Sequence, residues 1–178
     1  NYGAVEADTH GNSANGAGAA IHMAGICGFA TGNATNKICN DIAYCDNYGN
    51  ITSNSARSSG IVAAANNYTR INSCVNHGNQ LNSCGTTGRL GNITCILGTQ
   101  SIINGCTNHG DVVTTNSQSH AGGLLCLSNA TDCEIINSAN YGNVISDLTT
   151  YRGTLVANIN SLGKMDNNIA GGGIGSYN

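Results

Sequence analysis

The sequence of 178 residues contains no Pro, no Trp and a single Phe. Only 8% of the residues are charged, against roughly 25% in an average soluble domain. Low charge and modest hydrophobicity can indicate disorder, but disordered chains usually combine a high net charge with few β-branched residues. Here the net charge is −3, and Ile, Val, Leu and Thr recur in short regular clusters. The composition therefore favours an ordered β structure.

Positive charge is scarce and widely spaced along the chain, which predicts no basic patch for nucleic acid or anionic lipid. The six basic residues are Lys37, Arg57, Arg70, Arg89, Arg152 and Lys164. No apolar run approaches the roughly 20 residues that span a bilayer, so direct membrane insertion is not expected. The chain lacks an initiating Met and a signal peptide, and it starts in the middle of its own repeat. We therefore expect a piece of a longer protein.

Common catalytic and cofactor motifs are also missing. The sequence contains no Gly-x-Ser-x-Gly, no phosphate-binding loop and no dinucleotide fingerprint. Its nine cysteines include no Cys-x-x-Cys pair, whereas a zinc site needs four converging ligands. No cofactor and no metal site are predicted.

We instead expect the cysteines to be small buried side chains. Cys45, Cys74 and Cys106 share one position of a repeat, and we expect Ala139 to fill this position in the next copy. Exchange of Cys with Ala is typical of a small buried hydrophobe. The odd number of cysteines argues against a fully paired disulfide scaffold. One or more disulfides remain the alternative.

What the sequence does contain is a repeated phrase. An Asn-(Tyr/His)-Gly unit begins at residues 1, 47, 76, 108 and 140, with steps of 46, 29, 32 and 32 residues. A period near thirty residues is typical of a repeat architecture. Each copy also carries an Ile-x-x-Cys-like segment, such as Ile71–Cys74, and a Gly followed by a hydrophobe, such as Gly60-Ile61. These runs are too short and too rich in Gly for helices.

We therefore predict an all-β fold, a right-handed parallel β-helix (solenoid) of about six coils of ~30 residues with three short strands each. Residues 1-178 are expected to form a single module with coils starting near 1, 47, 76, 108 and 140. Each strand would pair with its equivalent one coil along, at about 4.8 Å. A segment rich in Gly, Asn and Ala, residues 10-20, is predicted to be a loop insertion.

Most residues of the repeated unit are assigned a structural role. Asn tolerates the left-handed conformation and Gly supplies positive φ, so both are predicted to form a sharp turn. Stacking would align the asparagines into an amide ladder, next to a column of cysteines. The predicted structural ladder comprises Asn47, Asn76, Asn108, Asn140, Cys45, Cys74 and Cys106.

The middle residue of the unit is Tyr or His in every copy, which predicts a column of rings along the solenoid. Such rings can stack against sugars, or they can simply stack on one another. The candidate binding residues are Tyr48, His77, His109 and Tyr141. A metal ion between the two histidines is disfavoured, because beyond Asp111 no third ligand is evident.

Paired carboxylates are the signal for the alternative, a carbohydrate-active enzyme. β-Helix lyases and hydrolases need clustered Asp or Glu with basic residues for acid–base work or a bound cation. The candidate pairs are Asp132 with Glu134 and Asp41 with Asp46. Each pair is isolated, and we expect no Lys or Arg at the adjacent coil position. Solvated loop charges are the favoured interpretation.

The phrase Ile-x-Asn-(Ser/Gly)-Cys-x-Asn-x-Gly-x-Val, followed by Gly-Gly-Leu-Leu, resembles the GLUG-type repeats of large bacterial surface and secreted proteins. Residues 71–145 match best. The resemblance implies a non-catalytic, adhesin-like β-helical module, extracellular or at the surface of bacteria such as Bacteroidetes. The implied partner is a glycan or a host surface protein, with no nucleic acid. A polysaccharide lyase or glycoside hydrolase of the parallel β-helix type is the alternative.

Overall fold

The computed structural model describes residues 1–7, 22–54, 57–83, 88–115, 119–148 and 150–176. In these ranges every regular element is a β-strand. No helix in the described part of the chain has the length and apolarity that a membrane crossing requires. The predicted loop at residues 10–20 lies outside the described residues.

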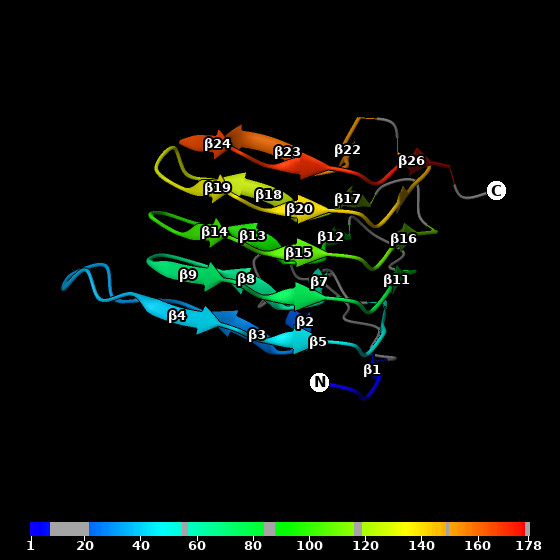
Figure 1. The fold of residues 1–178 in the computed structure, drawn as a ribbon, viewed down its shortest axis with the longest axis horizontal. Helices are drawn as coiled ribbons and strands as arrows, with labels where there is room; N and C mark the ends of the chain where they lie inside the picture. Colours follow the sequence, from blue (N-terminus) through cyan, green and yellow to red (C-terminus); the bar gives the residue numbers. More distant parts are fainter. Residues whose placement is uncertain (8–21, 55–56, 84–87, 116–118, 149, 177–178) are drawn as a thin grey trace, which may run out of the picture.

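The strands recur in sets of five, and each set stacks on the preceding one (Figure 1). The β1 sheet contains β1 (Val5–Ala7), β6 (Ile51–Ser53), β11 (Gln80–Asn82), β16 (Val112–Thr114), β21 (Val144–Ile145) and β26 (Ile174–Gly175). The β2 sheet contains β2 (His22–Ala24), β7 (Arg57–Ser59), β12 (Arg89–Gly91), β17 (His120–Gly122) and β22 (Arg152–Gly153). The β3 sheet contains β3 (Cys27–Ala30), β8 (Val62–Ala65), β13 (Thr94–Leu97), β18 (Leu125–Asn129) and β23 (Val156–Ser161).

Two further sheets complete each turn of the chain. The β4 sheet contains β4 (Asn40–Ala43), β9 (Thr69–Asn72), β14 (Ile102–Asn104), β19 (Glu134–Ile136) and β24 (Lys164–Asp166). The β5 sheet contains β5 (Asp46–Asn47), β10 (Val75–Asn76), β15 (Thr107–Asn108), β20 (Ala139–Asn140) and β25 (Ile169–Ala170).

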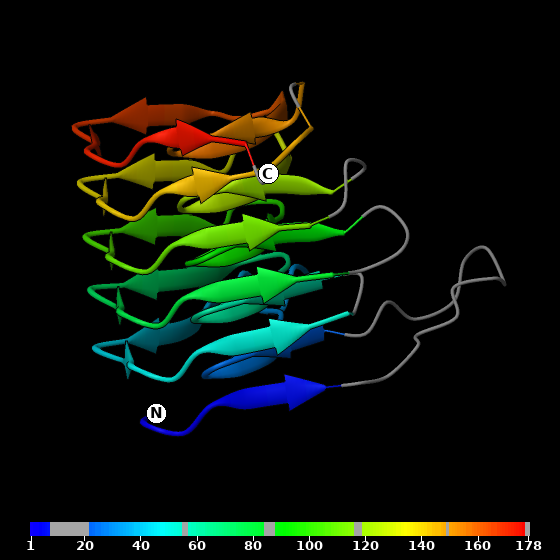
Figure 2. The ribbon, with the colours of Figure 1, turned by 90° about the vertical axis from the view of Figure 1, so that its right-hand side faces the viewer.

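These strands pair in parallel, and the register places equivalent residues of successive copies side by side. Ile71 pairs with Ile42 in one neighbouring strand and with Ile103 in the other, and Ile103 pairs with Ile135. The two termini lie at opposite ends of the stack (Figure 2). The prediction of an all-β parallel solenoid is therefore confirmed.

The predicted number of strands per coil is wrong, because the described strands form five sheets and not three. One reason is that a residue with a left-handed backbone conformation divides one predicted strand into two. Ser73, with a φ of 51°, separates β9 from β10. Only the β1 sheet has six strands and the other four have five, so the described residues do not form six complete coils.

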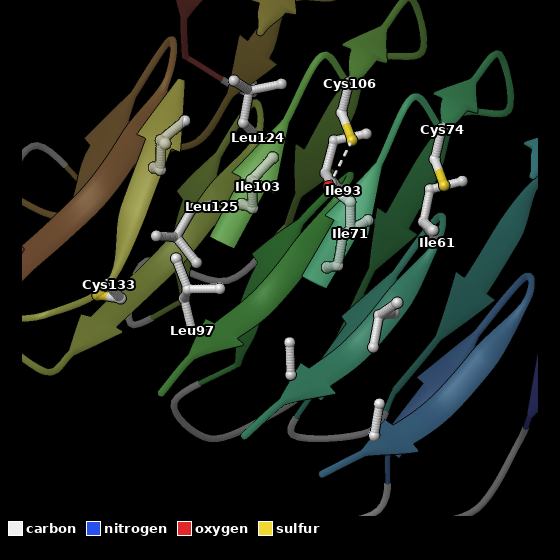
Figure 3. Packing of buried hydrophobic residues seen from close by; sticks show 14 residues of the cluster. Ile61, Ile71, Cys74, Ile93, Leu97, Ile103, Cys106, Leu124, Leu125 and Cys133 are labelled. Atoms are coloured by element: carbon white, nitrogen blue, oxygen red, sulfur yellow. Dashed lines mark hydrogen bonds between the residues drawn. The ribbon is translucent and has the colours of Figure 1, made fainter. Parts of the chain in front are cut away.

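The core consists of columns of like residues inside the stack (Figure 3). Ile71, Ile103 and Ile135 are all fully buried, and so are Ile61 and Ile93. Burying one such side chain contributes roughly 1.5–3 kcal/mol. Because each coil covers the apolar face of the next, stacking of the copies is the source of stability.

Candidate functional site

The asparagines of the repeated unit form a continuous chain of amide hydrogen bonds. Asn47 Nδ2 donates to Asn76 Oδ1 at 2.8 Å, Asn76 Nδ2 to Asn108 Oδ1 at 2.8 Å, and Asn108 Nδ2 to Asn140 Oδ1 at 2.6 Å. Asn1 joins at the start through a 3.0 Å bond to Asn47. The four later amides each also donate to the carbonyl two residues on, as Asn108 does to Gly110 at 2.7 Å. Asn47, Asn76, Asn108 and Asn140 are fully buried, so the ladder satisfies polar groups that water does not reach.

From the second unit on, the glycine of the unit is required by close approach between coils and not, as predicted, by a positive φ. Gly105 is the one described glycine in the left-handed region. A Cβ placed on Gly110 would collide with the carbonyl oxygen of Gly78, and one placed on Gly78 with that of Gly49. One set of left-handed residues instead stands directly before the cysteine column, and its members in the first three copies are Tyr44, Ser73 and Gly105. The positive φ predicted for the glycine of Asn-x-Gly is therefore wrong, whereas the chain does bend at this glycine, as at Gly49 and Gly78.

The second glycine motif lies against the amide ladder. A Cβ on Gly60 would collide with the side-chain amide of Asn76, and a Cβ on Gly123 with that of Asn140. The Asn-x-Gly motif and the Gly-hydrophobe motif therefore pack against each other. The glycine, which has no side chain, leaves room for the buried amide of the asparagine.

The rings of the repeated unit form an exposed stack. The centroid distances are 5.0 Å for Tyr2–Tyr48, 4.3 Å for Tyr48–His77, 5.2 Å for His77–His109 and 5.4 Å for His109–Tyr141. The planes of neighbouring rings lie within 14° of one another. Each of the three inner rings, Tyr48, His77 and His109, is stacked against a neighbouring ring on both faces. These three rings therefore present their edges, and not their faces, to a ligand. We call Tyr2, Tyr48, His77, His109 and Tyr141 the ring column.

The ring column and the amide ladder end in the same coil. Ala170 pairs in register with Asn140 and therefore stands in the ladder position. The next residue, Gly171, lies against the ring of Tyr141, because a Cβ placed on it would be 2.7 Å from Tyr141 Cδ1. The substitutions thus remove the amide and the ring together, which indicates that the two columns belong to one structural unit.

The cysteines of the described residues are free thiols, and Cys74 and Cys106 are fully buried. The expected continuation of their column at Ala139 is wrong, because Ala139 pairs with Thr107 and Ser138 occupies the cysteine position. Ser is nearly the size of Cys, and its hydroxyl donates, as the thiol does, to the backbone carbonyl two residues earlier. Ser138 Oγ donates to the Ile136 carbonyl at 2.8 Å, as Cys106 Sγ donates to the Asn104 carbonyl at 3.6 Å.

Two thiols of the cysteine column, Cys45 and Cys106, have a raised pKa. The hydrogen bond with Cys74, and then burial, raise the pKa of the Cys106 thiol. Burial raises the pKa of Cys45 as well, with the neighbouring Cys74 acting in the same direction. A raised pKa holds these two groups in the protonated, unreactive form.

A groove of about 290 Å³ brings together charged residues from separate copies of the repeat. Its lining comprises Lys37, Cys39, Tyr68, Arg70, Gln100, Ile102 and Asp132. Asp132 Oδ1 accepts a hydrogen bond from the Gln100 N–H at 3.1 Å. Strand register also places Arg70 beside Asp41, and Lys164 beside Glu134. The expectation that no basic residue stands one coil away from these carboxylates is therefore wrong, because register decides adjacency.

Four basic side chains that are far apart in the sequence are aligned on the β2 sheet. Register places His22 beside Arg57, Arg57 beside Arg89, and Arg89 beside His120. Each is the first residue of its strand and is partly exposed. We call these four residues the basic column. The signal in the sequence is that each stands three residues before the start of an apolar segment, at Gly25, Gly60, Asn92 and Gly123.

The side chains of Arg57 and His22 in the basic column are joined by a hydrogen bond. Arg57 Nη1 lies 2.8 Å from His22 Nε2, and because a guanidinium only donates, the imidazole nitrogen accepts and is unprotonated. Burial, and then the charge of Arg57, lower the pKa of His22. Burial also lowers the pKa of Arg57, and the charge of Arg89 acts in the same direction. Positive charges one coil apart therefore repel each other.

No three His, Cys, Asp or Glu side chains converge into a metal-binding group in the ranges that the structure describes. Comparison of the chain with protein-family models, with curated proteins and with solved structures found no match.

Proposed function

We propose that the chain is a non-catalytic module of a cell-surface or secreted bacterial protein, with an adhesin-like role and a right-handed β-helical winding. The observation that carries this proposal is the ring column, an exposed stripe of rings that runs over successive coils. The resemblance of the repeat to GLUG-type sequences supports the bacterial and extracellular setting.

The ring column offers hydrogen-bonding groups at regular spacing. Tyr48 and Tyr141 are 44% and 48% exposed, and His77 and His109 are exposed between them. A phenol oxygen both donates and accepts, and a neutral imidazole does the same through its two nitrogens. Because the coils repeat at about 4.8 Å, these groups form a polar edge suited to the hydroxyls of a glycan or to a host surface protein.

The test separates the polar edges of the rings from their stacking. A variant with Phe in place of Tyr48, His77, His109 and Tyr141 keeps a stack of four rings and loses its polar atoms. We expect the variant to keep its circular dichroism spectrum and to lose binding on a glycan and host-matrix array. Tyr44→Phe is the matched control, because Tyr44 is 85% exposed and lies outside the column. If alanine at all four positions leaves binding unchanged, the column is structural only.

The groove lined by Arg70 and Asp132 favours a second candidate, a polysaccharide lyase or glycoside hydrolase. Acid–base cleavage of a sugar chain commonly uses a pair of carboxylates, and Glu134 is two residues from Asp132 in the chain. Release of unsaturated or reducing ends from a polysaccharide, abolished by Asp132→Asn, would decide for this candidate and against the first.

A further inference from the structure

The charge of the chain is distributed unevenly over the solenoid. The described strands of the β2 sheet carry three of the six Lys and Arg residues and two of the five His residues. The described strands of this sheet and of the neighbouring β3 sheet carry no acidic residue, although the chain as a whole has a net charge of −3.

One role of the basic column is to cover an apolar surface. The His22 ring packs against Phe29 at 5.4 Å, and Phe29 belongs to a row with Ala64, Ile96 and Leu127. Long basic side chains cover such surfaces with their stems while the charged head remains in water. A Met or Leu would cover the surface equally well, however, so packing alone does not account for the charges.

Stacking of like charges has an electrostatic cost that a bound anion offsets. Arg57 and Arg89 are neighbours in register, at the strand spacing of about 4.8 Å. We propose that the basic column binds a linear acidic polysaccharide that carries one carboxylate on each sugar. A pyranose residue is about as long as the distance between coils, so carboxylates of the polysaccharide lie against Arg57 and Arg89 of neighbouring coils. The guanidinium groups bind carboxylates through two parallel hydrogen bonds.

The other linear polyanion, single-stranded nucleic acid, fits this surface less well. Proteins that bind it combine a basic groove with aromatic side chains on which the bases stack. The rings near the basic column are already in use, because Phe29 packs against His22 and Tyr151 packs against His120 at 4.2 Å. These two partly exposed rings contact His22 and His120, at opposite ends of the column, so the surface offers charge without a continuous row of stacking platforms.

This surface is separate from the ring column. The basic column stands on the β2 sheet, whereas each ring directly follows a strand of the β5 sheet or, for Tyr2, the position equivalent to it. The inference therefore goes beyond the proposed function and does not depend on it. Substitutions in the ring column test the proposed function, and substitutions in the basic column test polyuronate binding, so either proposal can fail without the other.

The experiment measures binding of labelled oligoglucuronate to the 178-residue chain. We expect salt-sensitive binding, because exposed ion pairs are screened. Arg89→Met keeps the stem and removes the charge, and we expect its affinity to fall about five- to tenfold, the loss of one charge-assisted contact. Arg89→Lys keeps the charge but cannot form the two parallel hydrogen bonds of a guanidinium, and we expect its affinity to fall about threefold. Melting curves of both variants show whether the fold is retained.

Lys164→Met is the matched control, since it removes the same charge from β24, on a different sheet and outside the groove. The proposal is overturned if Arg89→Met binds like the original chain, or if Lys164→Met weakens binding equally and only net charge matters. Equal affinity for a neutral cello-oligosaccharide of the same length, or tighter binding of a single-stranded oligodeoxynucleotide, also overturns it. If Arg89→Met unfolds, Arg89→Lys decides, since Lys cannot reproduce the guanidinium contact, and an unchanged affinity of Arg89→Lys then overturns the proposal.

Discussion

The amide ladder and the basic column are both stacks of like side chains, but they differ in what one member can do for the next. Asn108 donates to Asn140 and accepts from Asn76, so the ladder satisfies itself along its length. Arg89 stands between Arg57 and His120 in the same register. A guanidinium has only hydrogen-bond donors and is always charged. Two stacked arginines therefore cannot hydrogen-bond to each other, and their positive charges repel.

The difference shows that repetition of a residue in a solenoid is stabilising only when the side chain is complementary to itself. Amides and flat rings meet this condition, and thiols meet it through weak hydrogen bonds. Charged side chains of one sign do not, and their repetition indicates a partner outside the stack.

The largest effect is expected from breaking the close approach that the ladder requires. Gly110→Ala puts a methyl group into the carbonyl oxygen of Gly78, where backbone cannot move aside easily. We expect a loss of about 3 kcal/mol in the free energy of unfolding, measured by chemical denaturation. Gly175→Ala is the control, because its added Cβ would have Ile145 Cγ1 at 4.0 Å as its nearest contact. Equal losses in the two variants would contradict the close-approach argument.

A smaller effect is expected from interrupting the ladder itself. Asn108→Ala removes the acceptor of the Gly110 N–H and the donor to Asn140 Oδ1 in a fully buried site. Leaving buried polar groups unpaired costs about 2 kcal/mol, again measured by denaturation. Asn143→Ala, at an exposed position, is expected to cost less than about 1 kcal/mol. If the exposed and the buried Asn matter equally, the ladder is not a stabilising unit.

The smallest effect, and one of opposite sign, is expected in the basic column. In the absence of a ligand, Arg89→Met relieves repulsion from Arg57 and keeps the apolar stem. We expect an unchanged or slightly higher free energy of unfolding, by at most about 0.5 kcal/mol, with the gain declining as salt is added. Thermal melting at low and high ionic strength measures it. A destabilisation as large as that of Asn108→Ala would show that the column is structural.

Much of the fold follows from spacing alone. The recurrence of Asn-x-Gly at about thirty residues implies stacked parallel strands, because one copy cannot bury its own apolar face. It also places Asn47 next to Asn76 and Tyr48 next to His77, since equivalent positions of a stack must be neighbours. The buried Ile71, Ile103 and Ile135 column follows in the same way.

The sequence by itself thus determined the period, the parallel solenoid and the columns at equivalent positions. Only the tertiary structure decided the number of sheets and the role of Gly110 in the close approach between coils. It also decided that Ser138 follows Cys106 in the cysteine column and that Arg57 is aligned with Arg89. The physical reason is that a repeat dictates which copies touch, whereas φ angles, interstrand contacts and register within each coil dictate which atoms meet. Copies of unequal length hide that register until the chain is folded.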